Sequence, residues 1–167
     1  MIGRSLLRRT ELWLALGIVF ADQATKAIVR ASIGLHDNVE IVPGLLNLTH
    51  VLNTGAAFGL LNAADFPFKS VVVALLAIGA LVAIAIYAMT FGSETRLARL
   101  SLTLILAGAC GNLIDRATSG AVVDFVDVYW RTWHFWTFNV ADSAITVGAI
   151  LLVLDMFRTG KHVPSPA

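Results

Sequence analysis

Residues 70–91, SVVVALLAIGALVAIAIYAMTF, decide the fold class of this chain. The stretch has 22 positions without a charged side chain, and an α-helix of that length covers a hydrocarbon core of about 30 Å. The sequence therefore predicts a membrane-spanning helix at about 69–91. The whole chain agrees, because 57% of its 167 residues are hydrophobic and only 14% are charged. That composition lies outside the range of ordinary soluble domains.

Three further apolar segments accompany this one, and they predict helices at about 12–30, 98–115 and 138–157. The segment at 12–30 is the weakest of them, because Asp22 and Lys26 interrupt it. The prediction is an all-α polytopic membrane protein with four transmembrane helices, built as a single integral-membrane domain.

Basic residues indicate the orientation of these helices. Seven of them fall in three short segments that lie on one side of the predicted bundle: Arg4, Arg8, Arg9, Arg96, Arg99, Arg158 and Lys161. Because basic residues accumulate in cytoplasmic segments, both termini are expected in the cytoplasm. The loops at about 31–67 and 116–137 are then exoplasmic.

Both predicted exoplasmic loops carry structural signals. Residues 39–42 and 45–53 are β-prone segments around Pro43-Gly44, and they predict a small exoplasmic β-sheet resting on the membrane surface. The second loop is aromatic and holds three of the four tryptophans: Trp130, Trp133 and Trp136. An exoplasmic aromatic loop is typical of the membrane–water boundary, and a lipid-binding wall is the alternative interpretation.

Four aspartates lie inside or at the mouths of the predicted spans: Asp22, Asp115, Asp124 and Asp142. A carboxylate near the bilayer centre costs about 2.5–3.5 kcal/mol, so such groups usually face a cavity and serve a function. Asp22 and Lys26 are four residues apart and are expected to pair on one helix face. Asp124 and Asp142 can share one proton and activate a water molecule, as in an aspartic protease.

Polar residues accompany these aspartates at helical spacing. Asn112 precedes Asp115 by three residues and Arg116 by four, so the three can project from one face. Arg116 is expected to pair with a partly buried carboxylate and, together with Asp115, to position the loop that carries Asp124. Asn139 precedes Asp142 by three residues, and it either reaches the same cavity or caps the helix.

Three neighbouring positions are interpreted from their local sequence. Asp124 lies between valines and a phenylalanine, where desolvation is expected to raise its pKa. Asp127 is expected to be better solvated, as a surface or capping residue. Asn53 begins an Asn-Thr-Gly run and is expected in a turn.

Other chemistry has weaker support in the sequence. The chain has no Gly-x-Ser-x-Gly turn, no His-Glu-x-x-His signature and no phosphate loop. A net charge of +1 gives no reason to expect a nucleic-acid partner. One rival is a proton-coupled transporter with the aspartates and Lys26 as a relay, although no internal repeat supports it. A second rival is a metal-dependent lipid-modifying enzyme with carboxylate ligands.

Five short motifs occur in order along the chain: Asp22-Gln23-x-x-Lys26, Asn53-Thr54-Gly55-Ala56-Ala57-Phe58, Gly111-Asn112-x-x-Asp115-Arg116, Val123-Asp124-Phe125 and Phe138-Asn139-x-Ala141-Asp142. Each motif is weak alone, but the ordered set on a chain of this length is specific. It resembles the bacterial lipoprotein signal peptidase family, also called signal peptidase II or prolipoprotein signal peptidase.

The resemblance implies an activity and a site. Asp124 and Asp142 would be the catalytic pair, supported by Asp22, Lys26, Asn53, Gly55, Asn112, Asp115, Arg116 and Asn139. The substrate would be a prolipoprotein whose lipobox cysteine carries diacylglycerol, cut just before that cysteine, with no metal or organic cofactor. The resemblance also implies the bacterial inner membrane, contact with membrane lipid and inhibition by globomycin. A monomer without a nucleic-acid partner is expected.

Overall fold

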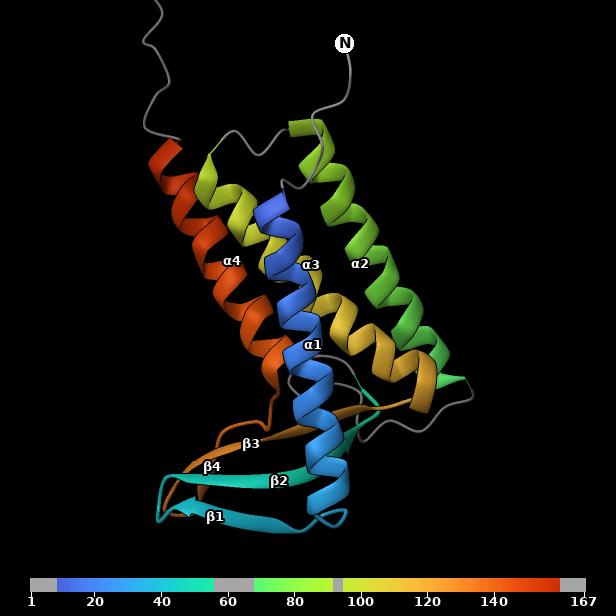
Figure 1. Cartoon of the computed structure of the whole chain (residues 1–167), viewed down its shortest axis with the longest axis vertical. Coiled ribbons are helices and arrows are strands. Elements are labelled where there is room, and N and C mark those ends of the chain that lie inside the picture. Colours follow the sequence, from blue (N-terminus) through green and yellow to red (C-terminus); the bar gives the residue numbers. More distant parts are fainter. Residues whose placement is uncertain (1–8, 56–67, 92–94, 160–167) are drawn as a thin grey trace, which may run out of the picture.

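In the computed structural model of the protein, the described residues form four helices, and a small sheet lies across one end of them (Figure 1). The structure describes residues 9–55, 68–91 and 95–159. The helices are α1 (Arg9–Ser32), α2 (Lys69–Phe91), α3 (Arg96–Ser119) and α4 (Val140–Thr159). The strands are β1 (Asn38–Val42), β2 (Leu46–Asn53), β3 (Val122–Trp130) and β4 (Trp133–His134). The end of the second motif, Ala56-Ala57-Phe58, and the basic residues Arg4, Arg8 and Lys161 lie outside the described residues.

The helices are those that the hydropathy pattern predicts. Within the described residues, three segments are long and apolar enough to cross a membrane: Arg9–Ser32, Arg96–Ser119 and Val140–Arg158. Helix α2 is also apolar and has 23 residues. The expected combination of apolar helices and a small antiparallel sheet is therefore confirmed.

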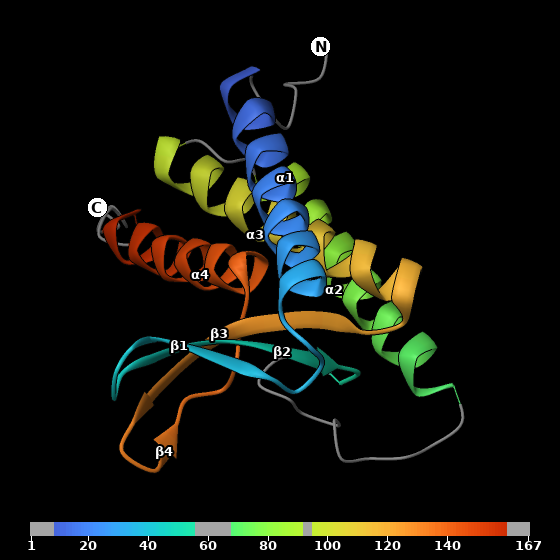
Figure 2. The same ribbon diagram turned by 60° about the horizontal axis from the view of Figure 1, so that its bottom comes forward.

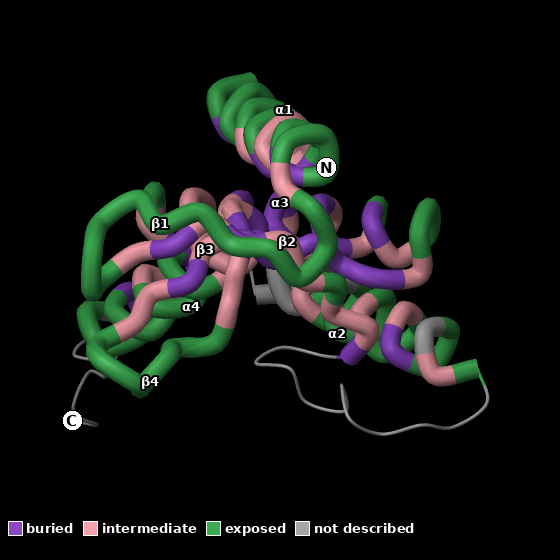
Figure 3. Tube along the Cα trace, turned by 90° about the horizontal axis from the view of Figure 1, so that it is seen from below, coloured by how far each residue is buried: buried purple, intermediate pink, exposed green. Residues whose placement is uncertain are grey.

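Helix α3 lies at the centre of the bundle, where it packs against α1, α2 and α4. Helix α2 packs mainly on α3, so it stands apart from α1 and α4. The sheet crosses the end of the bundle at which α1 and α3 finish and α2 and α4 begin (Figure 2). Seen from that end, buried residues gather along β3, whereas β1 is exposed along its length (Figure 3).

The sheet is antiparallel and has the order β1-β2-β3-β4. Strands β1 and β2 form the hairpin that the first loop predicts, but β3 comes from the second loop and was not predicted. Its sequence, VVDFVDVYW, is rich in β-branched and aromatic residues, and its two aspartates obscure the apolar pattern. The pairing of Val51 with Asp124 and of Asn53 with Val122 brings two of the five motifs side by side.

The turn after α3 directs the chain into β3. Gly120 adopts a left-handed conformation with φ of 75°, and its N–H donates to Arg116 O at 3.1 Å. A glycine suits this position because it carries no Cβ penalty at positive φ. The reversal places β3 beside the C-terminal part of α3, which carries Asn112, Asp115 and Arg116.

Close approach of α3 and α4 depends on glycine. A Cβ added at Gly108 would lie 2.3 Å from the backbone oxygen of Ala141 and 2.8 Å from Ile145 Cγ1. We therefore expect Gly108→Ala to force the helices apart, at a cost of about 1–3 kcal/mol, and to lower the melting temperature in detergent. Gly79→Ala is the matched control, because nothing lies within 4 Å of its added Cβ. Equal melting temperatures for the two variants would contradict this packing.

Candidate active site

Asp124 and Asp142 line one pocket at the sheet end of the bundle. The pocket has a volume of about 400 Å³. Its polar end is formed by Asn53, Asn112, Arg116, Asp124 and Asp142. The rest of the lining is mainly apolar and comes from α2, α3, α4 and the aromatic loop: Val73, Leu76, Ala77, Ala80, Ile84, Ile105, Ala109, Val122, Phe135, Trp136, Thr137, Phe138 and Ile145. The carboxyl groups of Asp124 and Asp142 therefore belong to the polar part of a mainly apolar pocket.

Asp124 is held from two sides by amide groups. Asn139 Nδ2 donates to its Oδ1 at 2.7 Å, and Asn53 Nδ2 donates to its Oδ2 at 3.0 Å. Asn53 Oδ1 in turn accepts the N–H of Gly55 at 3.0 Å. Asn53 therefore forms the turn that its sequence predicts and also fixes the carboxyl group of Asp124.

Burial raises the pKa of Asp124 from 3.8 to about 7. Desolvation is the largest cause, because the residue is only 2% exposed. The carboxylate of Asp142 raises the pKa further, while the amides of Asn53 and Asn139 and the charge of Lys26 act in the opposite direction. The apolar neighbours in the sequence predict this direction of the shift.

This pKa predicts a pH-dependent stability. Folded Asp124 keeps its proton up to about pH 7, whereas an unfolded aspartate loses it near pH 4. The unfolded state therefore binds fewer protons between these values, and stability falls as the pH rises through that interval. We expect Asp124→Asn to lose this dependence, so its melting temperature relative to wild type should rise from pH 4 to 7 and then level off. A constant difference across that range would contradict the shift.

Asp142 is positioned by the amides of Asn112 and Asn139. Asn112 Nδ2 donates to Asp142 Oδ1 at 2.7 Å, and the N–H of Asp142 donates to Asn139 Oδ1 at 2.9 Å. The second bond is an N-terminal cap of α4. Both interpretations of Asn139 are correct, because its oxygen caps the helix while its nitrogen reaches Asp124.

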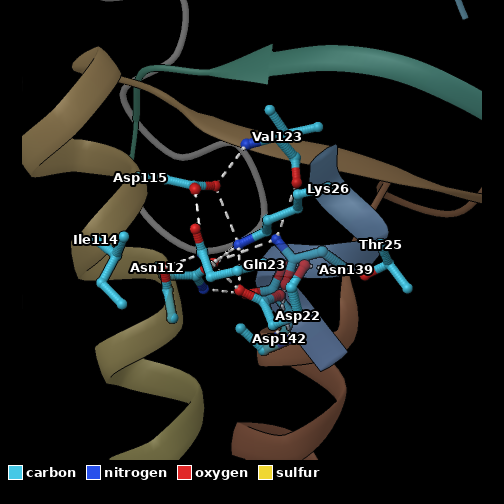
Figure 4. Close-up of polar contacts among 12 residues, drawn as sticks. Asp22, Gln23, Thr25, Lys26, Asn112, Ile114, Asp115, Val123, Asn139 and Asp142 are labelled. Carbon is cyan, nitrogen blue, oxygen red and sulfur yellow. Dashed lines mark hydrogen bonds and ion pairs between the residues drawn. The ribbon is translucent and has the colours of Figure 1, made fainter. Parts of the chain in front are cut away.

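Lys26 lies at the centre of a buried polar cluster (Figure 4). Asn112 connects this cluster to Asp142. The Nζ of Lys26 is 2.8 Å from Asp22 Oδ2, 3.0 Å from Asp115 Oδ2 and 3.0 Å from Asn112 Oδ1. These three acceptors use all three hydrogens of the ammonium group. Lys26 and Asp22 are fully buried, and Asp115 is 1% exposed. The predicted pairing of Asp22 with Lys26 is confirmed.

Asp115 links this cluster to the strand that carries Asp124. Its Oδ2 accepts the N–H of Val123 at 3.1 Å, and its Oδ1 is 3.0 Å from Arg30 Nη2. Arg116 does not take this place, because its Nη2 donates to Gly55 O at 2.9 Å and its Nη1 to Asn112 O at 3.4 Å. The expectation that Arg116 neutralises a carboxylate is wrong for Asp115, which Lys26 and Arg30 neutralise. Asp115 contacts β3 as expected, and Arg116 holds the turn that follows β2.

The site also contains residues that the sequence pattern did not predict. Arg30 follows Lys26 by four residues and Asp22 by eight, so helical spacing could have found it. Gln23 donates to Asp115 Oδ1 at 3.2 Å and to Gly111 O at 3.1 Å. Asp127 is not solvated as expected, because it is only 7% exposed. Among the described residues, no group of three or more His, Cys, Asp or Glu side chains could hold a metal ion.

Residues 14–158 match the family described as signal peptidase (SPase) II. The chain belongs to the signal peptidase II family. The lipoprotein signal peptidase of Geobacter metallireducens is 47% identical over 141 residues, which cover 84% of this chain and 86% of that protein. The lipoprotein signal peptidase of Geobacter sulfurreducens is 43% identical over 149 residues, which cover 89% and 92%.

A solved structure shares the fold of this chain. A bacterial membrane enzyme determined by the in meso method at 2.3 Å resolution matches with a TM-score of 0.81 and 31% identity. The match covers 95% of this chain and 93% of that one. The family resemblance of the five motifs is thus confirmed, and a transporter finds no support among these relatives.

Proposed function

We propose that the protein is an intramembrane aspartic endopeptidase that removes the signal peptide from diacylglyceryl-modified prolipoproteins, cutting before the lipidated cysteine. The observation that carries this proposal is the pair Asp124 and Asp142 in one pocket, with amide partners on each carboxyl group. The family and the names of its relatives supply the substrate class.

The chemistry follows from one proton shared by two carboxyl groups. A pKa of about 7 for Asp124 means that the pair retains one proton near neutral pH. The ionised carboxylate removes a proton from a bound water, whose oxygen attacks the scissile carbonyl carbon. The protonated carboxyl donates to the carbonyl oxygen. When the geminal-diol intermediate collapses, the first carboxyl delivers its proton to the leaving amine as the C–N bond breaks. The second carboxylate takes one proton back from the diol, which leaves the carboxylic acid product and restores the starting pair.

The surrounding residues hold the carboxyl groups of Asp124 and Asp142 in fixed positions. Asn112 and Asn139 join the two aspartates through their amides, and Lys26 fixes the amide oxygen of Asn112. Because Asn112 Oδ1 accepts a hydrogen bond from Lys26, the side-chain nitrogen of Asn112 faces Asp142. Asp22, Lys26, Asn53, Gly55, Asn112, Asp115, Arg116 and Asn139 act as positioning residues in this proposal.

The shape of the pocket suits a substrate that arrives from the membrane. Its apolar part is lined by α2, α3 and α4, and it ends at the two carboxyl groups. A lipidated precursor can place its apolar portion there while the peptide bond reaches the aspartates. A globomycin-type inhibitor would occupy the same space.

We further propose that both termini face the cytoplasm and that the sheet and the carboxyl pair face the exoplasmic side of the inner membrane. The chain would act there as a monomer in contact with lipid. The basic residues support this orientation, because Arg9, Arg96, Arg99 and Arg158 lie at the end of the bundle away from the sheet.

A cleavage assay tests the proposal. The purified protein in detergent should release the signal peptide from a diacylglyceryl-modified precursor, and it should leave the unmodified precursor largely uncut. Activity should survive a strong chelator. Loss of activity with the chelator would support the metal-dependent alternative, and absence of cleavage by folded protein would reject the peptidase.

A further inference from the structure

The pocket has an aromatic wall, residues 135–138, that follows the short strand β4. Its two ends are fixed to β3 through the backbone. The N–H of Phe135 donates to Val128 O at 2.8 Å, and Phe138 exchanges hydrogen bonds with Val126 at 2.8 and 3.1 Å. Phe135 also packs edge-on against Trp136 and Phe138, with ring centroids 5.8 and 6.1 Å apart. The wall is therefore one packed unit that follows directly from β4 and is bonded to β3 at both of its ends.

A histidine on β4 braces the start of this wall. His134 Nδ1 lies 2.9 Å from Asp127 Oδ1 and 3.0 Å from Asp127 Oδ2. Its ring stacks on Tyr129, with centroids 5.2 Å apart and an angle of 12° between the planes. The His134 side chain is 52% exposed, whereas that of Asp127 is 10% exposed. The carboxylate is thus built into the sheet, and the histidine closes over it from outside.

The support of this pair extends across the sheet. Asn47 Nδ2 donates to Asp127 Oδ2 at 3.1 Å from β2. Tyr129 Oη donates to Glu40 Oε1 at 2.6 Å, and the N–H of Gly44 donates to Tyr129 Oη at 2.9 Å. The bond to Glu40 raises the pKa of Tyr129, so this hydroxyl remains a donor. Both contacts of His134 are therefore anchored in neighbouring strands.

We propose that His134 and Asp127 form a latch that positions the aromatic wall and thereby sets how tightly the pocket binds the apolar part of the substrate. Neither side chain lines the pocket, so both act through the wall as positioning residues. This proposal rests on the proposed function, because the effect of the latch is measured as the KM for the substrate of that reaction. Its signature is a change in KM with little change in kcat.

Two substitutions of His134 test the hydrogen bond to Asp127. His134→Ala removes the donor, and we expect KM for the lipidated precursor to rise about 10-fold, with kcat changed less than twofold. His134→Asn keeps a neutral donor near the position of Nδ1, and we expect it to restore most of the affinity.

His36→Asn is the matched control. His36 is an exposed histidine near the same sheet, and asparagine tolerates its φ of 68°. We expect the wild-type KM in this variant. If KM is unchanged in His134→Ala, or if kcat alone falls, the latch is overturned while the peptidase stands.

Hydrogen exchange provides a readout without substrate. The amides of Phe135 and Phe138, which bond to β3, should exchange faster in His134→Ala than in His134→Asn. Unchanged exchange in both variants would overturn the latch even if the enzyme is active. If wild-type protein does not cleave the precursor, the proposed function fails and this assignment fails with it. The two failures are distinguished by the wild-type assay.

Discussion

Asp124→Asn and Asp142→Asn are each expected to reduce cleavage of a lipidated precursor on the order of 10³-fold, because each removes a group that must gain and lose a proton. An amide has nearly the size of the carboxyl group, so the shape of the pocket is retained, although at Asp124 the new NH2 group replaces one of the two oxygens that accept from Asn53 and Asn139. The measurement is kcat/KM in detergent with a defined diacylglyceryl-modified precursor. The double variant should lose little more than either single variant, since the two groups act as one unit.

A control distinguishes this effect from a general loss of carboxylates. Asp37→Asn changes an exposed aspartate next to β1, and we expect wild-type turnover in that variant. Each variant of the pair should also melt as a folded protein. Near-normal turnover by Asp124→Asn or Asp142→Asn would reject the catalytic pair.

Lys26→Met is expected to produce the largest loss of stability. The substitution removes the cation that contacts both buried carboxylates, Asp22 and Asp115, and among the described residues only Arg30 then still forms an ion pair with either of them. Breaking a buried ion pair on one side costs about 3–5 kcal/mol. The same change releases Asn112 Oδ1, which fixes the amide that holds Asp142. We therefore expect a large fall in the melting temperature together with loss of cleavage.

A second substitution tests the electrostatic origin of this effect. Adding Asp22→Asn to Lys26→Met removes one unpaired carboxylate, so the double variant should melt higher than Lys26→Met alone. Thr25→Ala is the control on the same helix, because within the described part of the chain the Thr25 hydroxyl donates to the local carbonyls of Ala21 and Asp22. A double variant less stable than Lys26→Met would show that packing, not charge, dominates.

Local spacing accounts for the parts of the site that the sequence predicts. The pair Asp22 and Lys26, the turn at Asn53 and the cap at Asn139 each lie within one helical turn or one loop. Such contacts depend on backbone geometry alone, so residue type and spacing are sufficient to find them. The apolar helices are predicted for a similar reason, because the hydropathy that identifies each helix is a property of one continuous segment.

Contacts between distant segments explain what the sequence did not predict. The partners of Asp115 are Lys26 and Arg30, which come from another helix, and helix packing decides which cation reaches a carboxylate. Asp127 is expected to be solvated from its local sequence, but Asn47 on β2 and His134 on β4 cover its side chain. Strand β3 was not predicted because its partner β2 lies about 80 residues away in the chain.

The hydrogen bond from Ala141 N–H to Asp22 Oδ1, at 3.0 Å, ties the start of α4 to the middle of α1. Asn112 completes the connection, because it joins Lys26 to Asp142. Ribosomal synthesis delivers these helices in order, so a nascent chain with α1 to α3 in the membrane has Asp124 without its partner. On the proposed mechanism, proteolytic competence arises only when α4 has inserted and docked. A half-made or truncated chain is therefore harmless to its neighbours during biogenesis.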